Sequence, residues 1–130
     1  MNIYFVLVAM LFLHVIDDYV LQAPCLGNLK QKSWWQKNAP DPQYKYDYIW
    51  ALLMHSFSWS FMVMLPIATF LNFSVGFGFL FFLVFNTVFH ALIDDCKANK
   101  RIINLWVDQI CHMVQIAGTF TIFVLGGLGC

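Results

Sequence analysis

The stretch from Asn86 to Lys97, NTVFHALIDDCK, places one histidine and two aspartates directly after a run of Phe, Leu and Val. Burying such groups in a protein core or a bilayer is costly unless they are paired or bind an ion. At helical spacing Asn86, His90 and Asp94 lie on one face, and apolar residues take the other faces. The stretch therefore predicts a helix in apolar surroundings whose one polar face meets another polar group.

The composition of the whole chain is that of a membrane protein. Of its 130 residues, 61% are hydrophobic and only 11% are charged. A soluble domain of this length has too much surface for its volume to hide so many apolar side chains. The formal net charge is zero, so the basic excess of a nucleic-acid-binding protein is missing and we expect no nucleic-acid partner.

Four apolar segments are each long enough to cross a bilayer, which takes about 20 residues of helix. We expect spans at approximately residues 3–22, 48–71, 74–95 and 102–125, forming an all-α, four-helix transmembrane bundle in one domain over residues 1–130. The polar loop between the first two spans is rich in Trp and Tyr, which suits the membrane interface, and part of it is predicted to be a short surface helix. No basic region precedes the first span, so we expect it to be retained rather than cleaved as a signal peptide.

The basic residues predict the orientation in the membrane. All seven Lys and Arg lie in the first and third of the three expected loops or at their edges, and four spans place those loops on one side. Because basic loops stay in the cytoplasm, we expect that side to be cytoplasmic and both termini to be outside.

Each span carries one of the four histidines, and three spans carry a polar stripe at four-residue spacing. These stripes are His14, Asp18 and Gln22; Asn86, His90 and Asp94; and Asn104, Asp108 and His112, while the second span has His55 alone. Counted from the span ends at roughly 1.5 Å per residue, the histidines fall in one layer, roughly 10 to 15 Å below the cytoplasmic interface. Antiparallel neighbours in a bundle would direct them toward a shared centre.

Imidazole and carboxylate groups gathered in one layer are the ligand types of a divalent transition metal, with zinc expected first. The candidate ligands are His14, Asp18, His55, His90, Asp94, Asp108 and His112. These seven groups exceed the four ligands of one tetrahedral ion, so they would suit two ions, or one ion and a general base. A metal with an open position activates water, which predicts hydrolysis, with Asp18, Asp94 and Asp108 as ligands or general base.

Other polar residues receive supporting roles. Gln22, Asn86, Asn104 and Gln109 are interpreted as hydrogen-bonding groups around the site or as contacts between helices. Lys97 is an end-of-helix cation that could bind an anionic substrate group, and Lys30 could do the same. Asp17 and Asp95, one position off their stripes, are expected at the membrane interface and not among the ligands.

The motifs H-V-I-D-D-Y-V-L-Q (14–22), H-A-L-I-D-D-C-K (90–97) and D-Q-I-C-H (108–112) resemble a bacterial and phage family of small multi-pass membrane proteins known as domain of unknown function 3307. The resemblance covers nearly the whole chain and implies functional roles for nine residues and a setting in a bacterial-type inner membrane. These residues are His14, Asp18, Gln22, His90, Asp94, Lys97, Asp108, Gln109 and His112. Tyr19 replaces a Phe of the family pattern, and His55 stands alone where the pattern has two histidines four apart, with Ala51 and Trp59 at the alternative positions.

Three functions are compatible with this pattern. The first is a membrane-embedded metal-dependent hydrolase that acts from the cytoplasmic leaflet on a lipid or a phosphate-bearing substrate. The second is a non-enzymatic four-span protein whose polar layer moves ions or protons or only holds the helices together. The third is a haem protein with two histidine ligands, for which the three carboxylates are poor neighbours.

Overall fold

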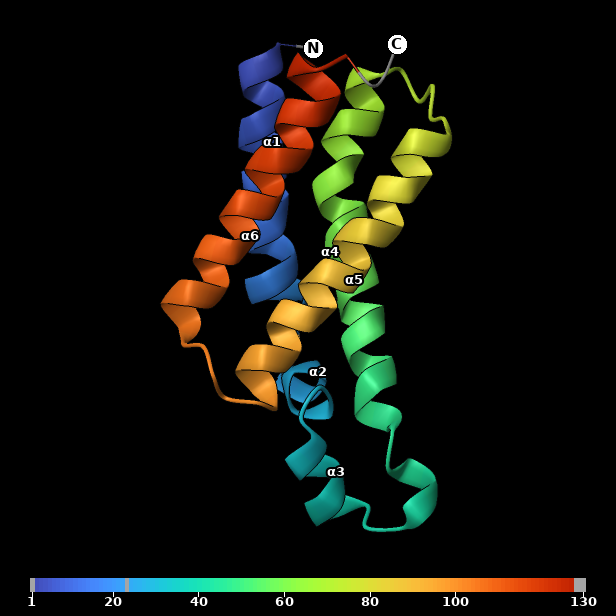
Figure 1. Ribbon diagram of the computed structural model, residues 1–130, viewed down its shortest axis with the longest axis vertical. Coiled ribbons are helices and arrows are strands. Elements are labelled where there is room, and N and C mark those ends of the chain that lie inside the picture. The colour runs from blue at the N-terminus through green and yellow to red at the C-terminus, as the bar shows by residue number, and fades with distance from the viewer. Residues whose placement is uncertain (1, 23, 128–130) are drawn as a thin grey trace.

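The computed structural model describes residues 2–22 and 24–127, and within these ranges the chain is all-helical (Figure 1). Six α-helices occur in the order α1 (Ile3–Val15), α2 (Pro24–Leu29), α3 (Lys32–Asn38), α4 (Asp47–Phe70), α5 (Phe77–Ala98) and α6 (Leu105–Phe120). Wider π-helical turns extend α1 through Ile16–Leu21 and α6 through Thr121–Leu125, and a 3₁₀ turn at Pro42–Tyr44 precedes α4. Four of these helical stretches are long and apolar enough to cross a membrane: Ile3–Leu21, Pro42–Phe70, Phe77–Ala98 and Leu105–Leu125.

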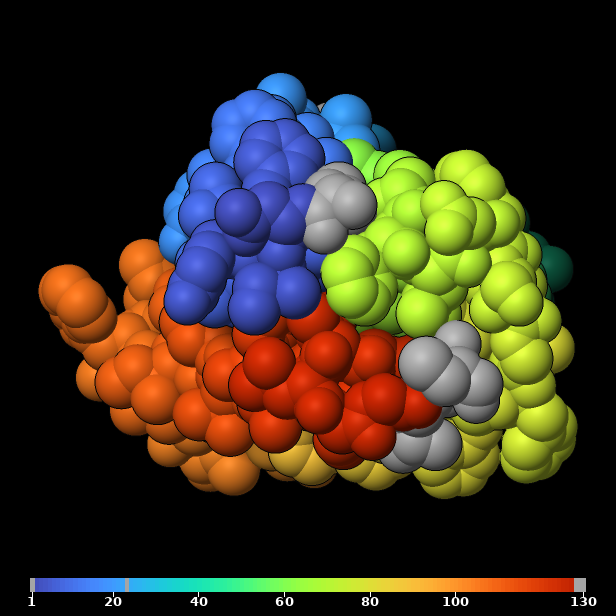
Figure 2. Space-filling view, turned by 90° about the horizontal axis from the view of Figure 1, so that it is seen from above, coloured from blue at the N-terminus to red at the C-terminus, as the bar shows by residue number. Residues whose placement is uncertain are grey.

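The four long helices pack side by side, each antiparallel to its two neighbours in the order α1, α4, α5 and α6 (Figure 1). The beginning of α1 and the end of α6 lie at the same end of the bundle, which Figure 2 shows face on. The short helices α2 and α3 lie at the opposite end, where they contact the beginning of α4. The loop between the first two spans, expected to contain one short surface helix, thus contains two short helices, α2 and α3. They lie at the end of the bundle opposite to the beginning of α1 and the end of α6.

Helix boundaries follow local capping. The side chain of Asn2 accepts a hydrogen bond from the Tyr4 amide at the start of α1. Asn104 does the same for the Val107 amide, so α6 begins at Leu105, three residues later than expected. At the other boundary, α4 ends in a turn where Asn72 and Phe73 adopt positive φ angles of 51° and 59°, and α5 starts only at Phe77.

An apolar core fills the half of the bundle near the chain ends. Its buried members are Val6, Met10, Trp59, Val63, Met64, Ile67, Ile116, Phe120 and Phe123. In contrast, the outward faces of the long helices carry large apolar side chains, such as Tyr4 at 75% and Phe77 at 83% exposure. The buried His and Asp side chains gather in the other half, toward the connections, and that half contains the candidate site.

Candidate metal centre

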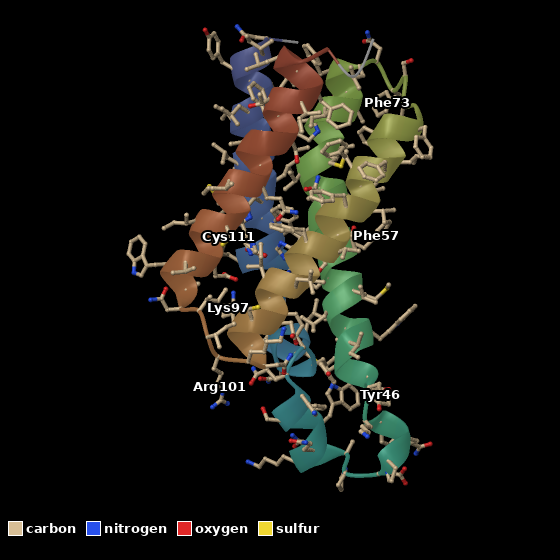
Figure 3. All side chains as sticks on the ribbon, in the orientation of Figure 1. Tyr46, Phe57, Phe73, Lys97, Arg101 and Cys111 are labelled. Carbon is tan, nitrogen blue, oxygen red and sulfur yellow. The ribbon has the colours of Figure 1, made fainter. Side chains whose placement is uncertain are left out.

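All four histidines point into the bundle from different helices. Their side chains are at most 2% exposed and come from α1, α4, α5 and α6: His14, His55, His90 and His112. Four aspartates lie among them, two from the π-helical turn after α1 and one each from α5 and α6: Asp17, Asp18, Asp94 and Asp108. We call these eight residues the His–Asp cluster. Figure 3 labels Phe57 on α4 and Cys111 on α6, which lie at the same height along the bundle. They are close in sequence to His55 and His112 and so mark the level of the cluster.

His55 is at the centre of the best-formed group of potential metal ligands. Its Nε2 atom lies 3.3 Å from Asp18 Oδ1 and 3.3 Å from His90 Nε2. The three ligand atoms of Asp18, His55 and His90 all lie within 4.8 Å of one another. Bonds of about 2.0 to 2.2 Å to a tetrahedral Zn²⁺ would separate ligand atoms by about 3.3 to 3.6 Å. The two 3.3 Å separations from His55 Nε2 match the spacing expected around such an ion.

A second group, formed by His90, Asp94 and His112, also has its ligand atoms within 4.8 Å of one another. However, the His90 and His112 rings stack with centroids 4.2 Å apart and planes tilted by only 25°. The lone pair of an imidazole nitrogen lies in the ring plane, so two stacked rings direct their lone pairs along nearly parallel planes. The His55 and His90 rings are tilted by 55°, which lets their Nε2 atoms converge, and this makes the Asp18, His55 and His90 group the better site.

His14 is held in a different way. Its Nδ1 atom receives a hydrogen bond of 2.8 Å from the indole N–H of Trp59, and its Nε2 atom lies 3.1 Å from Gln109 Oε1. An indole N–H can only donate, so Nδ1 carries no proton, and a neutral ring then donates from Nε2 to Gln109. Both nitrogens are used, and the arrangement gives His14 a supporting position instead of the ligand role expected from the sequence.

Asp17 is buried in the cluster with 1% exposure, so the expectation that it lies at the membrane interface is wrong. Its Oδ1 atom accepts a 2.6 Å hydrogen bond from Ser58, and its Oδ2 atom lies 3.6 Å from His55 Nδ1. The cause is the π-helical turn Ile16–Leu21, whose larger number of residues per turn reduces the rotation between consecutive residues and lets both aspartates face α4. Asp95, by contrast, lies at the half-buried rim of α5, bonded to Asn99 and near Lys100.

Asp94 shares its two oxygens between several partners. Oδ2 accepts a 2.5 Å hydrogen bond from Lys30 and lies 3.6 Å from His55 Nε2, whereas Oδ1 lies 3.8 Å from His112 Nε2. Lys30 follows α2 and is 3% exposed, so this ammonium enters the bundle from the end with the connections. In the amide orientation that satisfies its neighbours, Gln22 accepts a hydrogen bond from Lys30 at 2.8 Å and donates to the Asp18 carbonyl.

Asp108 connects the cluster to the outer surface. Its Oδ2 atom accepts hydrogen bonds from Lys97 at 2.6 Å and from Gln109 at 3.1 Å, and its Oδ1 atom lies 3.5 Å from His112 Nε2. The Lys97 side chain is 33% exposed and lies near the end of α5, beside α6 (Figure 3). Gln109 also lies 3.4 Å from Asp18, so its amide joins α6 to α1.

Two of the predicted supporting residues lie away from the cluster. Asn104 is exposed and caps α6, so the expected stripe on this helix begins only at Asp108, and the prediction that Asn104 faces the site is wrong. Asn86 is buried one turn nearer the apolar core, where it bonds Thr119 at 3.1 Å and receives a 2.9 Å bond from Gln115. Asn86 therefore joins α5 to α6 without reaching the histidines.

Trp59 is a buried part of the site to which sequence reasoning gave no role. Its ring stacks on His90 with centroids 4.3 Å apart while its N–H binds His14. The signal was present, because Trp59 lies four residues after His55 and therefore on the same face of α4. It occupies one of the two positions where the family resemblance suggests a further histidine.

The charges of the cluster leave room for a cation. Four aspartate side chains share the cluster with two lysine side chains, Lys30 beside Asp94 and Lys97 beside Asp108. Within the described part of the chain, Asp17 Oδ2, Asp108 Oδ1, His90 Nδ1 and both ring nitrogens of His112 are buried without a hydrogen-bond partner. Imidazole and carboxylate groups are ligands of divalent transition metals, so the cluster as a whole has the chemistry to hold such an ion, although the unpartnered atoms are not those that lie 3.3 Å from His55 Nε2.

The fold and the site together define an all-helical protein with four helices able to cross a membrane and a buried His–Asp cluster between them. The chain belongs to the protein family of unknown function DUF3307, whose family model matches residues 6–127. Neither a curated protein nor a solved structure matches the chain.

Proposed function

We propose that this protein is a membrane-embedded, metal-dependent hydrolase with its centre at Asp18, His55 and His90. The observation that carries the proposal is the convergence of three ligand atoms from three helices, with His55 Nε2 3.3 Å from both Asp18 Oδ1 and His90 Nε2. Three protein ligands and one open position are the pattern of catalytic zinc sites. A divalent ion bound there would lower the pKa of a coordinated water toward neutrality and supply a hydroxide nucleophile.

The neighbouring residues have roles that follow from their positions. Asp94 Oδ2 lies 3.6 Å from His55 Nε2, and we assign this carboxylate the role of accepting a proton from water. Lys30 holds this carboxylate in place with a 2.5 Å hydrogen bond. Lys97 is the partly exposed cation beside the cluster, and it suits the anionic group of a lipid or another phosphate-bearing substrate.

The setting we propose is the inner membrane of a bacterial-type cell. The outward faces of the long helices are apolar, with Trp106 at 80% and Phe12 at 62% exposure, and water would be a poor solvent for them. All seven Lys and Arg lie at the end of the bundle that carries α2 and α3, so that end belongs on the cytoplasmic side. The cluster then lies in the inner-leaflet half, where a lipid substrate can approach it.

Two alternatives fit the packing less well. An ion or proton pathway would have to continue to the far side, but there the apolar core containing Val63, Ile67 and Phe120 fills the bundle. A haem between two histidines would need room for its ring. His55 and His90 instead lie 3.3 Å apart with Asp18 and Asp94 beside them.

Metal content and hydrolysis test the proposal together. We expect the purified protein to hold stoichiometric metal by elemental analysis and to release phosphate from phosphatidic acid in proteoliposomes when Zn²⁺ or Mn²⁺ is added. His55→Gln and Asp18→Asn should lose the metal and at least about 100-fold of the activity, since each removes one ligand. Asp41→Asn, in the exposed connection before α4, is the matched control and should behave like the wild type. A wild-type protein with neither bound metal nor metal-stimulated hydrolysis of phosphate or carboxylate esters overturns the proposal.

A further inference from the structure

We infer that Asp17 is a positioning residue that fixes the tautomer and orientation of His55, the central ligand of the proposed metal site. The inference rests on the proposed function, because it concerns how a ligand of that site is prepared. It assigns a role to a buried carboxylate that lies outside the group of converging ligand atoms.

The two nitrogens of His55 face different carboxylates. Nε2 faces the converging ligand atoms, with Asp18 Oδ1 at 3.3 Å, and Nδ1 faces Asp17 Oδ2 at 3.6 Å. A neutral imidazole has one lone pair and one N–H, so Nε2 can bind a cation only when the proton is on Nδ1. That proton needs an acceptor, and Asp17 Oδ2 is a buried oxygen without a hydrogen-bond partner in the described part of the chain.

Asp17 is itself held in place by the helix that carries His55. Ser58, three residues after His55 on α4, donates a 2.6 Å hydrogen bond to Asp17 Oδ1 and leaves Oδ2 directed at the ring. Asp17 and His55 are 1% and 2% exposed, so no solvent competes for this contact. A carboxylate behind a metal-binding histidine orients the ring and raises its basicity, and losing it typically costs 10- to 100-fold in metal affinity.

Asp17→Asn separates this role from a merely structural one. The asparagine oxygen can still accept the Ser58 hydrogen bond, but its amide donates toward Nδ1 and so moves the proton of His55 to Nε2. We expect the Zn²⁺ affinity, measured by calorimetry on protein in detergent, to fall about 10- to 100-fold. Asp17→Glu, which keeps a carboxylate, should recover part of that loss.

The tautomer of His55 is read by ¹⁵N NMR on metal-free protein labelled at histidine. We expect the proton on Nδ1 in the wild type, with His90 Nε2–H donating to His55 Nε2, and on Nε2 in Asp17→Asn, where Asp18 Oδ1 can accept it. We expect Asp95→Asn, at the rim of α5, to change neither the tautomer nor the affinity. Because this measurement needs no metal, it remains decisive for Asp17 even if the hydrolase proposal fails. The same tautomer in wild type and Asp17→Asn, or an unchanged Zn²⁺ affinity, overturns the inference.

Discussion

At the scale of single residues, the role of each histidine depends on what its two ring nitrogens contact. His14 and His55 are both almost completely buried, and both lie close to Asp18. The nearest Asp18 oxygen is 3.6 Å from a ring nitrogen of His14 and 3.3 Å from one of His55. They differ because Trp59 and Gln109 use both nitrogens of His14, whereas His55 Nε2 faces ligand atoms from two other helices. Residue type and spacing alone give both the same role, so only contacts across the bundle can separate a ligand from a support.

His14→Ala tests this distinction. We expect the variant to keep its metal, because no lone pair of His14 is free, but to lose about 2 to 4 kcal/mol of stability from the cavity and the unpaired Trp59 N–H. Metal content per chain and thermal unfolding in detergent measure the two effects. His55→Ala is the matched comparison and should lose the metal. Loss of metal from both variants to the same extent would make His14 a ligand after all.

At the scale of secondary-structure elements, the sequence predicted the helices and their polar faces but not the irregular turn that completes the site. The spacing of His90 and Asp94 places both on the inner face of α5, as a regular helix requires. After α1, however, the π-helical turn Ile16–Leu21 turns Asp17 inward together with Asp18. Such a turn depends on what the chain packs against, here Ser58 and His55 of α4, so the local pattern carries no clear sign of it.

The short helix α2 matters to the site because the residue after it, Lys30, inserts an ammonium between the long helices. The ion pair between Lys30 and Asp94 joins two side chains that are 4% and 3% exposed. Removing one member of a buried ion pair typically lowers the free energy of unfolding by about 3 to 5 kcal/mol. We therefore expect Lys30→Met to be destabilised by about that amount without metal. Added Zn²⁺ should raise its melting temperature more than that of the wild type, because the ion replaces a missing positive charge.

Thermal unfolding of metal-free and Zn²⁺-loaded protein in detergent measures this difference. Lys37→Met, which removes an exposed lysine of α3, is the control and should match the wild type in both states. An equal rise in melting temperature for Lys30→Met and the wild type would show that Lys30 and the metal do not share the charge of Asp94.

At the scale of the whole molecule, composition and four apolar stretches were enough to predict an all-helical bundle with its polar residues in one half. Asn104 shows the limit of that prediction. It has the same four-residue spacing as Asp108 and His112, which are buried, but α6 begins at Leu105, so Asn104 lies outside the helix and is exposed. Trp59 and Lys30 show another limit. The four-residue spacing from His55 places Trp59 on the same face of α4, but the residue types of Trp59 and Lys30 do not indicate contact with a buried imidazole and a buried carboxylate.

The placement of charge along the bundle also predicts the orientation of the membrane protein that we propose. The turn between α4 and α5 contains no Lys or Arg, whereas the turn between α5 and α6 contains Lys100 and Arg101. With the four native cysteines replaced by serine, Ser74→Cys and Lys100→Cys place single exposed thiols at opposite ends. A membrane-impermeant maleimide should label Ser74→Cys on intact spheroplasts, and it should label Lys100→Cys only after permeabilisation, because translocating the basic loop is disfavoured. The reverse labelling pattern would place the His–Asp cluster in the outer-leaflet half, where a cytoplasmic substrate could not reach it.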